Sequence, residues 1–315
     1  MITAMKRILS LILFISLLSL ASAQNAEWKT LKGDLDFIIA NDLGRNGYYE
    51  QKPIAELMGN MAEEIGPEAV LALGDVHHFD GVQSTADPLW TSNFEMIYTH
   101  PELMIAWLPI CGNHEYRGNT AAVTGYSAVS RRWRMTDYYY SKTFCDDGVS
   151  LKIIFLDTTP LIEKYRSETD KYPDACKQNA EEQLSWLENE LKADTATWTV
   201  VVGHHPIYAF TSKDDSERID MQKKVDSILR RHNVDMYICG HIHNFQHYKV
   251  SGYDIDYIVN SSGSLSRNKV NKNDPGCVFA SGDAGFSVLT VKNKSLSLSM
   301  IDSTGKIIHT VTRHK

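Results

Sequence analysis

Cysteine is scarce in this chain, which excludes a dense disulfide framework. The 315 residues include five cysteines, an odd number that leaves at least one unpaired. Cys111 and Cys239 end apolar runs, which predicts buried thiols. Cys145, Cys176 and Cys277 lie in polar segments, and one pair among them is compatible with a disulfide in an exported protein. The pairing stays open at this stage.

Positive charge is also in deficit. The chain has 32 lysine and arginine residues against 39 aspartate and glutamate residues, which gives a formal net charge of −7. An acidic surface argues against nucleic acid as a partner and against binding to anionic membranes. Any positive field that attracts an anionic substrate must therefore be local. Repeats and low-complexity linkers are absent as well, which favours a single domain over residues 24–315. The oligomeric state is not indicated.

Long apolar runs are absent after the first two dozen residues. Lys6 and Arg7 precede an apolar run over residues 8–20, and Ala21-Ser22-Ala23 follows as a cleavage site between small residues. This order predicts a secretory signal peptide over residues 1–23, because the run is short for a membrane span. We therefore expect a secreted or periplasmic protein without stable membrane insertion.

The apolar runs of the remaining chain mostly have the length of strands. We predict six strands, over residues 36–40, 69–73, 104–111, 151–156, 197–202 and 234–239. Helical spacing of apolar residues predicts helices over residues 54–65, 184–191 and 219–229, the last with Ile219 on its apolar face. A polar stretch predicts a long loop over residues 261–285, and three more strands are expected near residues 286–291, 296–301 and 307–311. This alternation indicates an α/β fold.

Five short clusters of carboxylate, amide and imidazole side chains follow apolar runs. They are Asp42-Leu43-Gly44, Gly74-Asp75-Val76-His77-His78, Gly112-Asn113-His114-Glu115, Gly203-His204-His205-Pro206 and Gly240-His241-Ile242-His243. Ligands of α/β sheets bind at the carboxyl ends of the strands, so we expect these clusters to converge. Oxygen and imidazole donors gathered at one point predict two metal ions, and two adjacent metals favour the hydrolysis of a phosphate ester.

The clusters, in this order, resemble the motifs of the metallophosphoesterases, and most closely those of the small purple acid phosphatases of the tartrate-resistant type. Shorter matches lie between them, such as Ser130-Arg131-Arg132-Trp133 and Gln183-Leu184-Ser185-Trp186-Leu187. The likeness covers nearly the whole chain after the predicted signal peptide. It implies a two-sheet β-sandwich flanked by helices on both sides, a four-layer α/β/β/α arrangement.

Two carboxylates are implied as ligands by the resemblance. Asp42 resembles the carboxylate of the first metal, although its local sequence is also typical of a plain turn. Asp75 resembles the carboxylate that bridges both metals, and its alternative role is that of a helix N-cap. Gly74 favours the ligand role for Asp75, because glycine permits a sharp turn. His243 resembles a second ligand of the first metal.

The second metal and the substrate have their own counterparts. Asn113, His204 and His241 resemble the ligands of the second metal. His114 resembles the catalytic histidine, which contacts the phosphate or protonates the leaving oxygen, and imidazole suits both tasks near neutral pH.

Four neighbouring residues are expected in lesser roles. We expect Glu115 to orient His114 and His205 to support the ligands. His77 is expected beside the ligands, or as a ligand itself if His78 is turned away. Lys213 lies near the place where the tartrate-resistant enzymes have a further histidine, and we expect it to be an exposed lysine.

His78 departs from the family pattern. Purple acid phosphatases have a tyrosine here, whose phenolate binds Fe(III) and gives the colour, while most other metallophosphoesterases have a histidine at the position of Gly44. The first metal therefore lacks both usual donors unless His78 supplies one. The alternative is that His78 faces solvent and that water fills the place. We expect His78 to be a metal ligand.

Charge balance then predicts the kind of metal. With a neutral His78, two divalent ions, two carboxylates and one hydroxide leave a single positive charge. Fe(III), a divalent ion and a tyrosinate would leave the same charge in the coloured enzymes. We therefore expect two divalent ions, such as zinc, manganese or Fe(II), in a colourless protein, and Fe(III) is disfavoured.

The resemblance implies a metal-dependent phosphomonoesterase that uses a metal-bound hydroxide. Its substrate would be a small phosphate ester or a phosphoprotein. A phosphodiesterase or nucleotidase on the same core is the first alternative, because the motifs do not define the other half of the ester. A non-catalytic protein that keeps its metals for recognition is the second, and the presence of His114 and Asp75 argues against it.

Overall fold

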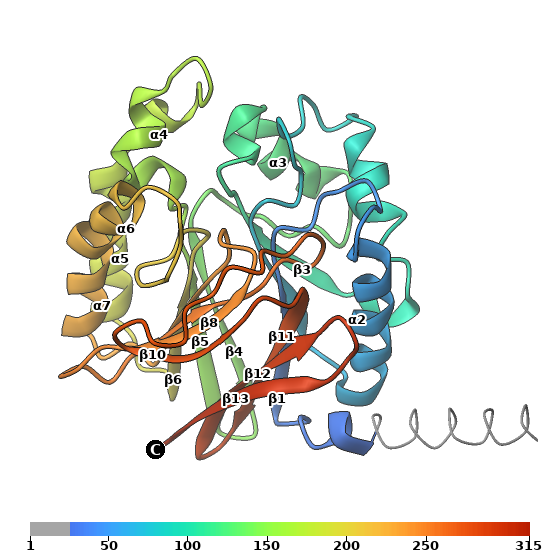
Figure 1. Cartoon of the computed structure of the whole chain (residues 1–315), viewed down its shortest axis with the longest axis vertical. Coiled ribbons are helices and arrows are strands. Elements are labelled where there is room, and N and C mark those ends of the chain that lie inside the picture. Colours follow the sequence, from blue (N-terminus) through green and yellow to red (C-terminus); the bar gives the residue numbers. More distant parts are fainter. Residues whose placement is uncertain (1–25) are drawn as a thin grey trace, which may run out of the picture.

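The computed structural model describes residues 26–315, so the predicted signal peptide over residues 1–23 lies outside the described residues. Two β-sheets face each other, and helices cover the outer side of each (Figure 1). Apolar side chains form one continuous core, where the ring of Phe37 from one sheet meets that of Phe144 from the other at 4.8 Å. The predicted α/β sandwich with its helix, sheet, sheet and helix layers is confirmed.

The first sheet has six strands in the order β13-β12-β11-β1-β2-β3. Three of them are parallel to one another: β1 (Leu35–Ala40), β2 (Ala69–Leu73) and β3 (Ala106–Ile110). The other three are antiparallel to their neighbours: β11 (Gly285–Lys292), β12 (Ser295–Asp302) and β13 (Ile307–His314). Every residue of β1 and β2 is buried, which explains their almost unbroken apolar sequence.

The second sheet has seven strands in the order β10-β8-β9-β7-β6-β5-β4. Its parallel strands are β5 (Val149–Phe155), β6 (Trp198–Val202), β7 (Met236–Cys239) and β9 (Asp256–Val259). Its antiparallel strands are β4 (Tyr140–Asp146), β8 (Phe245–Lys249) and β10 (Cys277–Ser281). The parallel strands thus occupy one side of the first sheet, with β3 at its edge, and the central part of the second.

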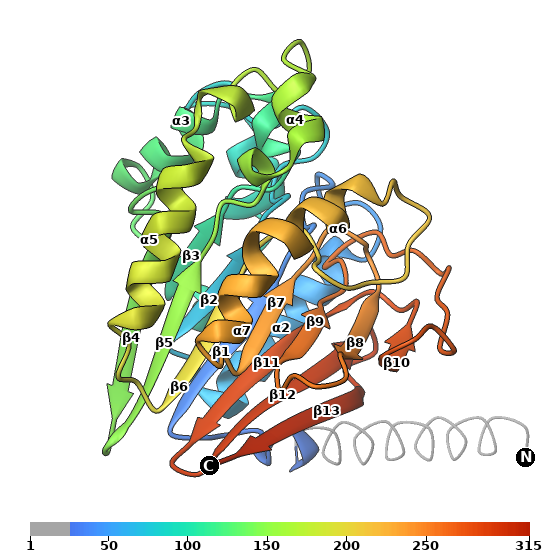
Figure 2. The ribbon, with the colours of Figure 1, turned by 90° about the vertical axis from the view of Figure 1, so that its left-hand side faces the viewer.

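The helices divide between the two outer faces. The first sheet is covered by α2 (Gln51–Ile65). The second is covered by α5 (Ala180–Lys192), α6 (Ser216–Met221) and α7 (Ser227–Arg231), as Figure 2 shows. The short helices α3 (Thr120–Gly125) and α4 (Glu163–Ser167) lie at the upper end of Figure 1. Among residues 26–315, no helix has the length and apolar character needed to cross a membrane.

Some element boundaries differ from the prediction. The strand expected over residues 104–111 begins at Ala106, after a short 3-10 helix over Pro101–Leu103. The helix expected over residues 219–229 is interrupted by a π-helical turn over Gln222–Asp226, which shifts the helical register. Ile219 lies in α6, before this turn, and is 44% exposed, so it is not on the apolar face as expected. The long loop expected over residues 261–285 contains strand β10.

All five cysteines are free thiols. Cys111 and Cys239 are buried, as predicted. Cys145 lies on β4 and Cys277 on β10, which are the opposite edges of the second sheet. Cys176 lies in a 3-10 helix over Ala175–Lys177. A disulfide needs Cα atoms within about 7 Å, so the pair that the sequence allowed does not form in this fold.

Candidate metal centre

The predicted ligand residues follow the carboxyl ends of parallel strands from both sheets. Asp42, Asp75 and Asn113 follow β1, β2 and β3 of the first sheet. The histidine clusters that begin at His204 and His241 follow β6 and β7 of the second sheet. The two sheets face each other, and the carboxyl ends of their parallel strands lie at the same end of the sandwich (Figure 2). Residues far apart in the sequence therefore meet there.

A first group of ligand atoms comes from Asp42, Asp75, His78 and His243. One ligand atom from each lies within 4.8 Å of all the others, and all four residues are buried. His243 Nε2 is 3.0 Å from Asp42 Oδ1, and His78 Nε2 is 3.6 Å from Asp75 Oδ2. His78 thus lies beside both carboxylates and does not face solvent.

A second group comes from His204, His205 and His241, again within 4.8 Å and buried. His204 Nε2 is 3.2 Å from His241 Nδ1. It is also 3.3 Å from Asp75 Oδ2, so Asp75 stands between the two groups. This is the place that a bridging carboxylate requires.

Several donor atoms of the centre lack other partners. Within residues 26–315, no hydrogen bond satisfies the Asn113 Oδ1, either ring nitrogen of His78, or His205 Nε2. Buried polar atoms without partners are costly, and native structures rarely keep them. A cation can take the lone pair of Asn113 Oδ1, of His205 Nε2 and of one His78 nitrogen, while the other His78 nitrogen carries a proton. Mixed oxygen and imidazole donors suit divalent zinc, manganese or iron. The residues present therefore fit a pair of metal ions.

The backbone is strained at four of the ligand residues. Asp42, Asp75, His241 and His243 have φ values of 53°, 52°, 71° and 63°. This left-handed conformation is unfavourable for residues with a Cβ atom and costs about 1–3 kcal/mol at each position. Such strain persists only where the surrounding structure holds it, and it is typical of functional sites.

Glycine allows the loops of the centre to approach each other closely. A Cβ atom at Gly112 would lie 2.2 Å from Asp75 Oδ1, and one at Gly44 would lie 2.2 Å from the carbonyl oxygen of Val76. A histidine therefore cannot replace Gly44 unless the loop moves. A metal ligand that a histidine at position 44 would supply must therefore come from another residue. His78 belongs to the first group and offers such a ligand atom.

The protonation states of His78 and His241 favour metal binding, whereas His204 must lose a proton to bind a cation. Burial lowers the pKa of His78 well below its ordinary value. Burial, followed by the nearby Lys213 ammonium, lowers the pKa of His241 to about 3. Both imidazoles are therefore neutral at pH 7, with a lone pair for a cation. Burial also acts to lower the pKa of His204, but the Asp75 carboxylate outweighs it and raises that pKa to about 9.

Glu115 holds the Asp75 loop. Its carboxylate accepts hydrogen bonds from the backbone N–H groups of Asp75, Gly112 and His77 at 2.8, 2.7 and 2.9 Å. We expected Glu115 to orient His114, but the His114 ring is oriented through Nδ1 by the carbonyl oxygen of Phe79 at 2.6 Å. A carboxylate that is used by three loop amides is not directed at that ring.

His114 lies at the open side of the centre. Its Nε2 is 3.9 Å from Asp75 Oδ2, and its side chain keeps 17% of its surface exposed. Its backbone N–H donates to Asp75 Oδ1 at 2.9 Å. The ring therefore stands next to the bridging carboxylate and remains accessible to a substrate.

His77 and His205 differ in their positions. His77 packs its ring on Trp90 at 4.3 Å, with Nδ1 3.4 Å from the amide nitrogen of Asn93, and it is in neither ligand group. His205 directs Nδ1 to the hydroxyl of Thr158 at 2.8 Å. Its free Nε2 belongs to the second group, so His205 offers a donor that the sequence placed only in support.

Glu217 is a contact that sequence analysis missed. Its Oε2 lies 2.9 Å from His241 Nε2, and both side chains are 3% exposed. This contact fixes the ring so that Nδ1 faces His204. The stretch around Glu217 contains Asp214 and Asp215 and resembles an exposed acidic surface, so no local signal distinguishes it.

Lys213 is an exposed residue, as expected, but its ammonium contacts His241. Nζ lies 2.9 Å from His241 Nε2 and donates to the His241 carbonyl oxygen at 2.8 Å. A cation therefore stands directly behind a ligand of the second group.

Comparison with known families agrees with this geometry. The family description "Calcineurin-like phosphoesterase" matches residues 35–245, which include all the ligand residues named above. The chain therefore belongs to the calcineurin-like phosphoesterases, hydrolases that act on phosphoric esters.

Among its relatives are purple acid phosphatases. The chain is 30% identical over 289 residues to purple acid phosphatase 7 of Arabidopsis thaliana, covering 89% of this chain and 86% of the relative. It is 27% identical to the tartrate-resistant acid phosphatase type 5 of Homo sapiens, covering 80% of this chain and 81% of the relative.

Solved structures share the fold. A protein described as GAP50, the anchor in the inner membrane complex of Plasmodium, superposes with a TM-score of 0.75 at 23% identity, covering 89% of this chain and 88% of that one. The purple acid phosphatase PPD1 of yellow lupin superposes with a TM-score of 0.64 at 16% identity, covering 89% and 53%.

Proposed function

We propose that this protein is a phosphomonoesterase with two divalent metal ions. The observation that carries the proposal is the position of Asp75, which lies within 3.6 Å of His78 and 3.3 Å of His204 and so joins the two ligand groups. Asp42, His78 and His243 would hold the first ion, and Asn113, His204 and His241 the second. When bound, the ions supply an activated water and the positive charge that offsets the charge developing on the phosphate.

The residues of the chain have distinct tasks in this reaction. Water forms a bond to phosphorus while the bond from phosphorus to the ester oxygen breaks, and the alcohol leaves after taking up a proton. His114 faces the centre with Nε2, because Nδ1 is bonded to the carbonyl oxygen of Phe79. When both ring nitrogens carry a proton, Nε2 would deliver its proton to the leaving oxygen or donate a hydrogen bond to the phosphate. Glu115 keeps the loop of Asp75 in place.

The divalent state of both ions is part of the proposal. His78 replaces the phenolate that would favour Fe(III), and a neutral imidazole leaves the charge balanced for two divalent ions. The purified protein is expected to be colourless. An absorption band from a phenolate bound to Fe(III) would contradict this assignment.

One experiment separates the proposed function from its alternatives. The metal-loaded protein is expected to release phosphate from p-nitrophenyl phosphate and to act poorly on bis-p-nitrophenyl phosphate. The reverse preference would indicate a phosphodiesterase. His114→Ala is expected to lose about 10²- to 10⁴-fold in turnover while its metal content is unchanged. A wild-type protein that binds metal without turnover would indicate a binding protein.

Export is a separate proposal. It rests on the order of charged, apolar and small residues over 1–23 and places the catalytic domain at residues 24–315. Mass spectrometry of the protein from the producing cell should find an N-terminus at Gln24. An intact N-terminus in the cytoplasmic fraction would contradict it.

A further inference from the structure

A cationic pocket adjoins the second ligand group. It has a volume of about 270 Å³ and is lined by Thr211, Ser212, Lys213, Ile242, Asn244, Arg267 and Lys269. Three of these residues carry positive charge, and none of the lining residues is acidic. This is the kind of local positive field that a chain with a net charge of −7 needs in order to hold an anion.

The pocket is continuous with the loops of the centre. Ile242, which lines the pocket, lies between His241 and His243 in the sequence. Lys213 donates to the carbonyl oxygen of His241 at 2.8 Å. The backbone N–H of Arg267 donates to the carbonyl oxygen of His243 at 2.6 Å. The pocket therefore borders the loop that carries His241 and His243.

The loop that carries Arg267 and Lys269 is held in position by the buried side-chain amide of Asn244. Asn244 is 1% exposed, and its side chain donates to the carbonyl oxygens of Arg267 and Lys269 at 3.5 and 3.3 Å. Gln246 in turn donates to Asn244 Oδ1 at 2.7 Å. Arg267 and Lys269 thus extend from a backbone that is tied to the histidine loop.

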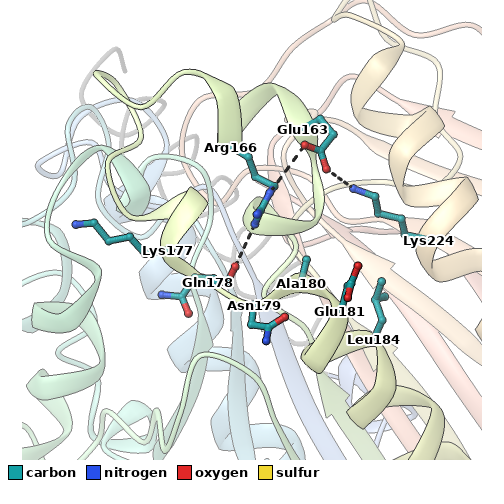
Figure 3. A pocket seen from close by; sticks show the side chains of 9 residues that line it. All are labelled: Glu163, Arg166, Lys177, Gln178, Asn179, Ala180, Glu181, Leu184 and Lys224. Carbon is teal, nitrogen blue, oxygen red and sulfur yellow. Dashed lines mark hydrogen bonds and ion pairs between the residues drawn. The ribbon is translucent and has the colours of Figure 1, made fainter.

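The charges in this pocket are not neutralised by the protein. Within residues 26–315, no ion pair or side-chain hydrogen bond engages the guanidinium of Arg267 or the ammonium of Lys269. A larger pocket of about 580 Å³ differs in this respect. There Glu163 pairs with Arg166 and Lys224, as Figure 3 shows. Free cations next to the centre, unlike these paired ones, are available to a ligand.

We infer that the pocket binds a second phosphate of the substrate, so that the preferred substrates are small bisphosphorylated esters. This inference rests on the proposed function, because the first phosphate must lie at the metals. The volume is below the range of about 300–1,000 Å³ that is usual for a whole ligand. It therefore suits one arm of a substrate, and phosphate is a group that arginine binds with two hydrogen bonds and lysine with a point charge.

The test compares esters on one scaffold. The metal-loaded protein is given fructose 1,6-bisphosphate, fructose 1-phosphate and fructose 6-phosphate, with p-nitrophenyl phosphate as a general substrate. We expect kcat/KM for the bisphosphate to exceed that of either monophosphate by about tenfold, the effect of one added charge-assisted contact. The preference should shrink at high ionic strength, because the cations are exposed.

Variants locate the effect. In the double variant Arg267→Gln, Lys269→Gln the ratio of kcat/KM between bisphosphate and monophosphate should fall about tenfold. Lys272→Gln, which removes one charge from the same loop outside the pocket, should keep the wild-type ratio. The ratio is insensitive to a general loss of folded protein.

The outcomes separate the inference from the proposed function. The inference would be overturned by equal kcat/KM for bisphosphate and monophosphate, or by a ratio that does not change in the double variant. In either case, hydrolysis of p-nitrophenyl phosphate would still support the proposed function. A wild-type protein that hydrolyses none of the four esters would overturn both.

Discussion

His78 is buried between Asp75 and the rings of His114 and His243, and neither of its ring nitrogens has a hydrogen-bond partner among residues 26–315. Its neighbour His77 is equally buried but faces away, onto Trp90. Two adjacent histidines thus have opposite surroundings. The spacing in the sequence cannot distinguish them, but their contacts do.

This pair gives a first prediction. His78→Ala should lower the metal content from about two ions per chain to about one, because the first metal loses a donor. His77→Ala is the matched control and should keep both ions while it loses packing on Trp90. Elemental analysis after gel filtration measures both. A His78→Ala protein with full metal content would show that water fills this position.

Glu217 gives a second prediction at the same scale. Its contact with His241 Nε2 orients a ligand of the second group. Glu217→Gln should weaken binding of the second metal by about 10- to 100-fold, as is typical when a partner of a metal-bound histidine is changed. Asp215→Asn, which alters an exposed carboxylate nearby, is the control. Titration with a metal indicator measures the affinity, and equal values for the two variants would exclude the role.

At the scale of elements, the helix over residues 216–231 shows where sequence periodicity fails. Ile219 and Val225 are six residues apart, so even an unbroken α-helix of 3.6 residues per turn would place them about 120° apart. The π-helical turn over Gln222–Asp226 also interrupts the helical register. Val225 is fully buried and Ile219 is 44% exposed. Val225→Ala should lower the free energy of unfolding by about 2 kcal/mol. Ile219→Ala should change it by less than about 0.5 kcal/mol. Urea unfolding of both variants checks this, and equal losses would contradict it.

Strand β1 carries a buried carboxylate that makes stability depend on pH. Burial raises the pKa of Asp36 from 3.8 to about 6, and its Oδ1 has no partner among residues 26–315. Its charged form therefore destabilises the folded chain. Wild-type stability should fall as the pH rises from about 4 through 6, whereas Asp36→Asn should not show this fall.

The gain of Asp36→Asn over the wild type should thus be larger at pH 8 than at pH 4, by roughly 2 kcal/mol. Urea unfolding at both pH values measures it, with EDTA present so that loss of metal does not contribute. A gain independent of pH would show that Asp36 has an ordinary pKa in the folded chain.

Most of the parallel strands were predictable because buried strands have largely apolar sequences, but the short parallel strand β9 was not. Strands β1, β2, β5, β6 and β7 each coincide with such a run, and each ligand cluster follows one of the predicted strands. Strands β4, β8, β9 and β10 were not predicted, because their sequences mix polar and apolar residues. For example, β4 is Tyr-Ser-Lys-Thr-Phe-Cys-Asp, with a largely exposed face.

At the scale of the whole molecule, the site depends on how the two sheets meet. The predicted ligands Asp42, Asp75 and Asn113 follow strands of the first sheet, and His204, His241 and His243 follow strands of the second. Motif order and the family resemblance were sufficient to name these residues. The supporting contacts of Glu115, Glu217 and Lys213 were not predictable, because they arise from tertiary packing between segments that carry no motif of their own.

The most direct test of a centre shared by both sheets is the metal content of the wild type and of Asp75→Ala. Asp75, the proposed bridging carboxylate, belongs to the first ligand group and lies 3.3 Å from His204 of the second. After loading with zinc and gel filtration, elemental analysis should find about two ions per wild-type chain and fewer than one in the variant. A wild-type chain that retains no zinc, or an Asp75→Ala chain that retains as much as the wild type, would contradict the account.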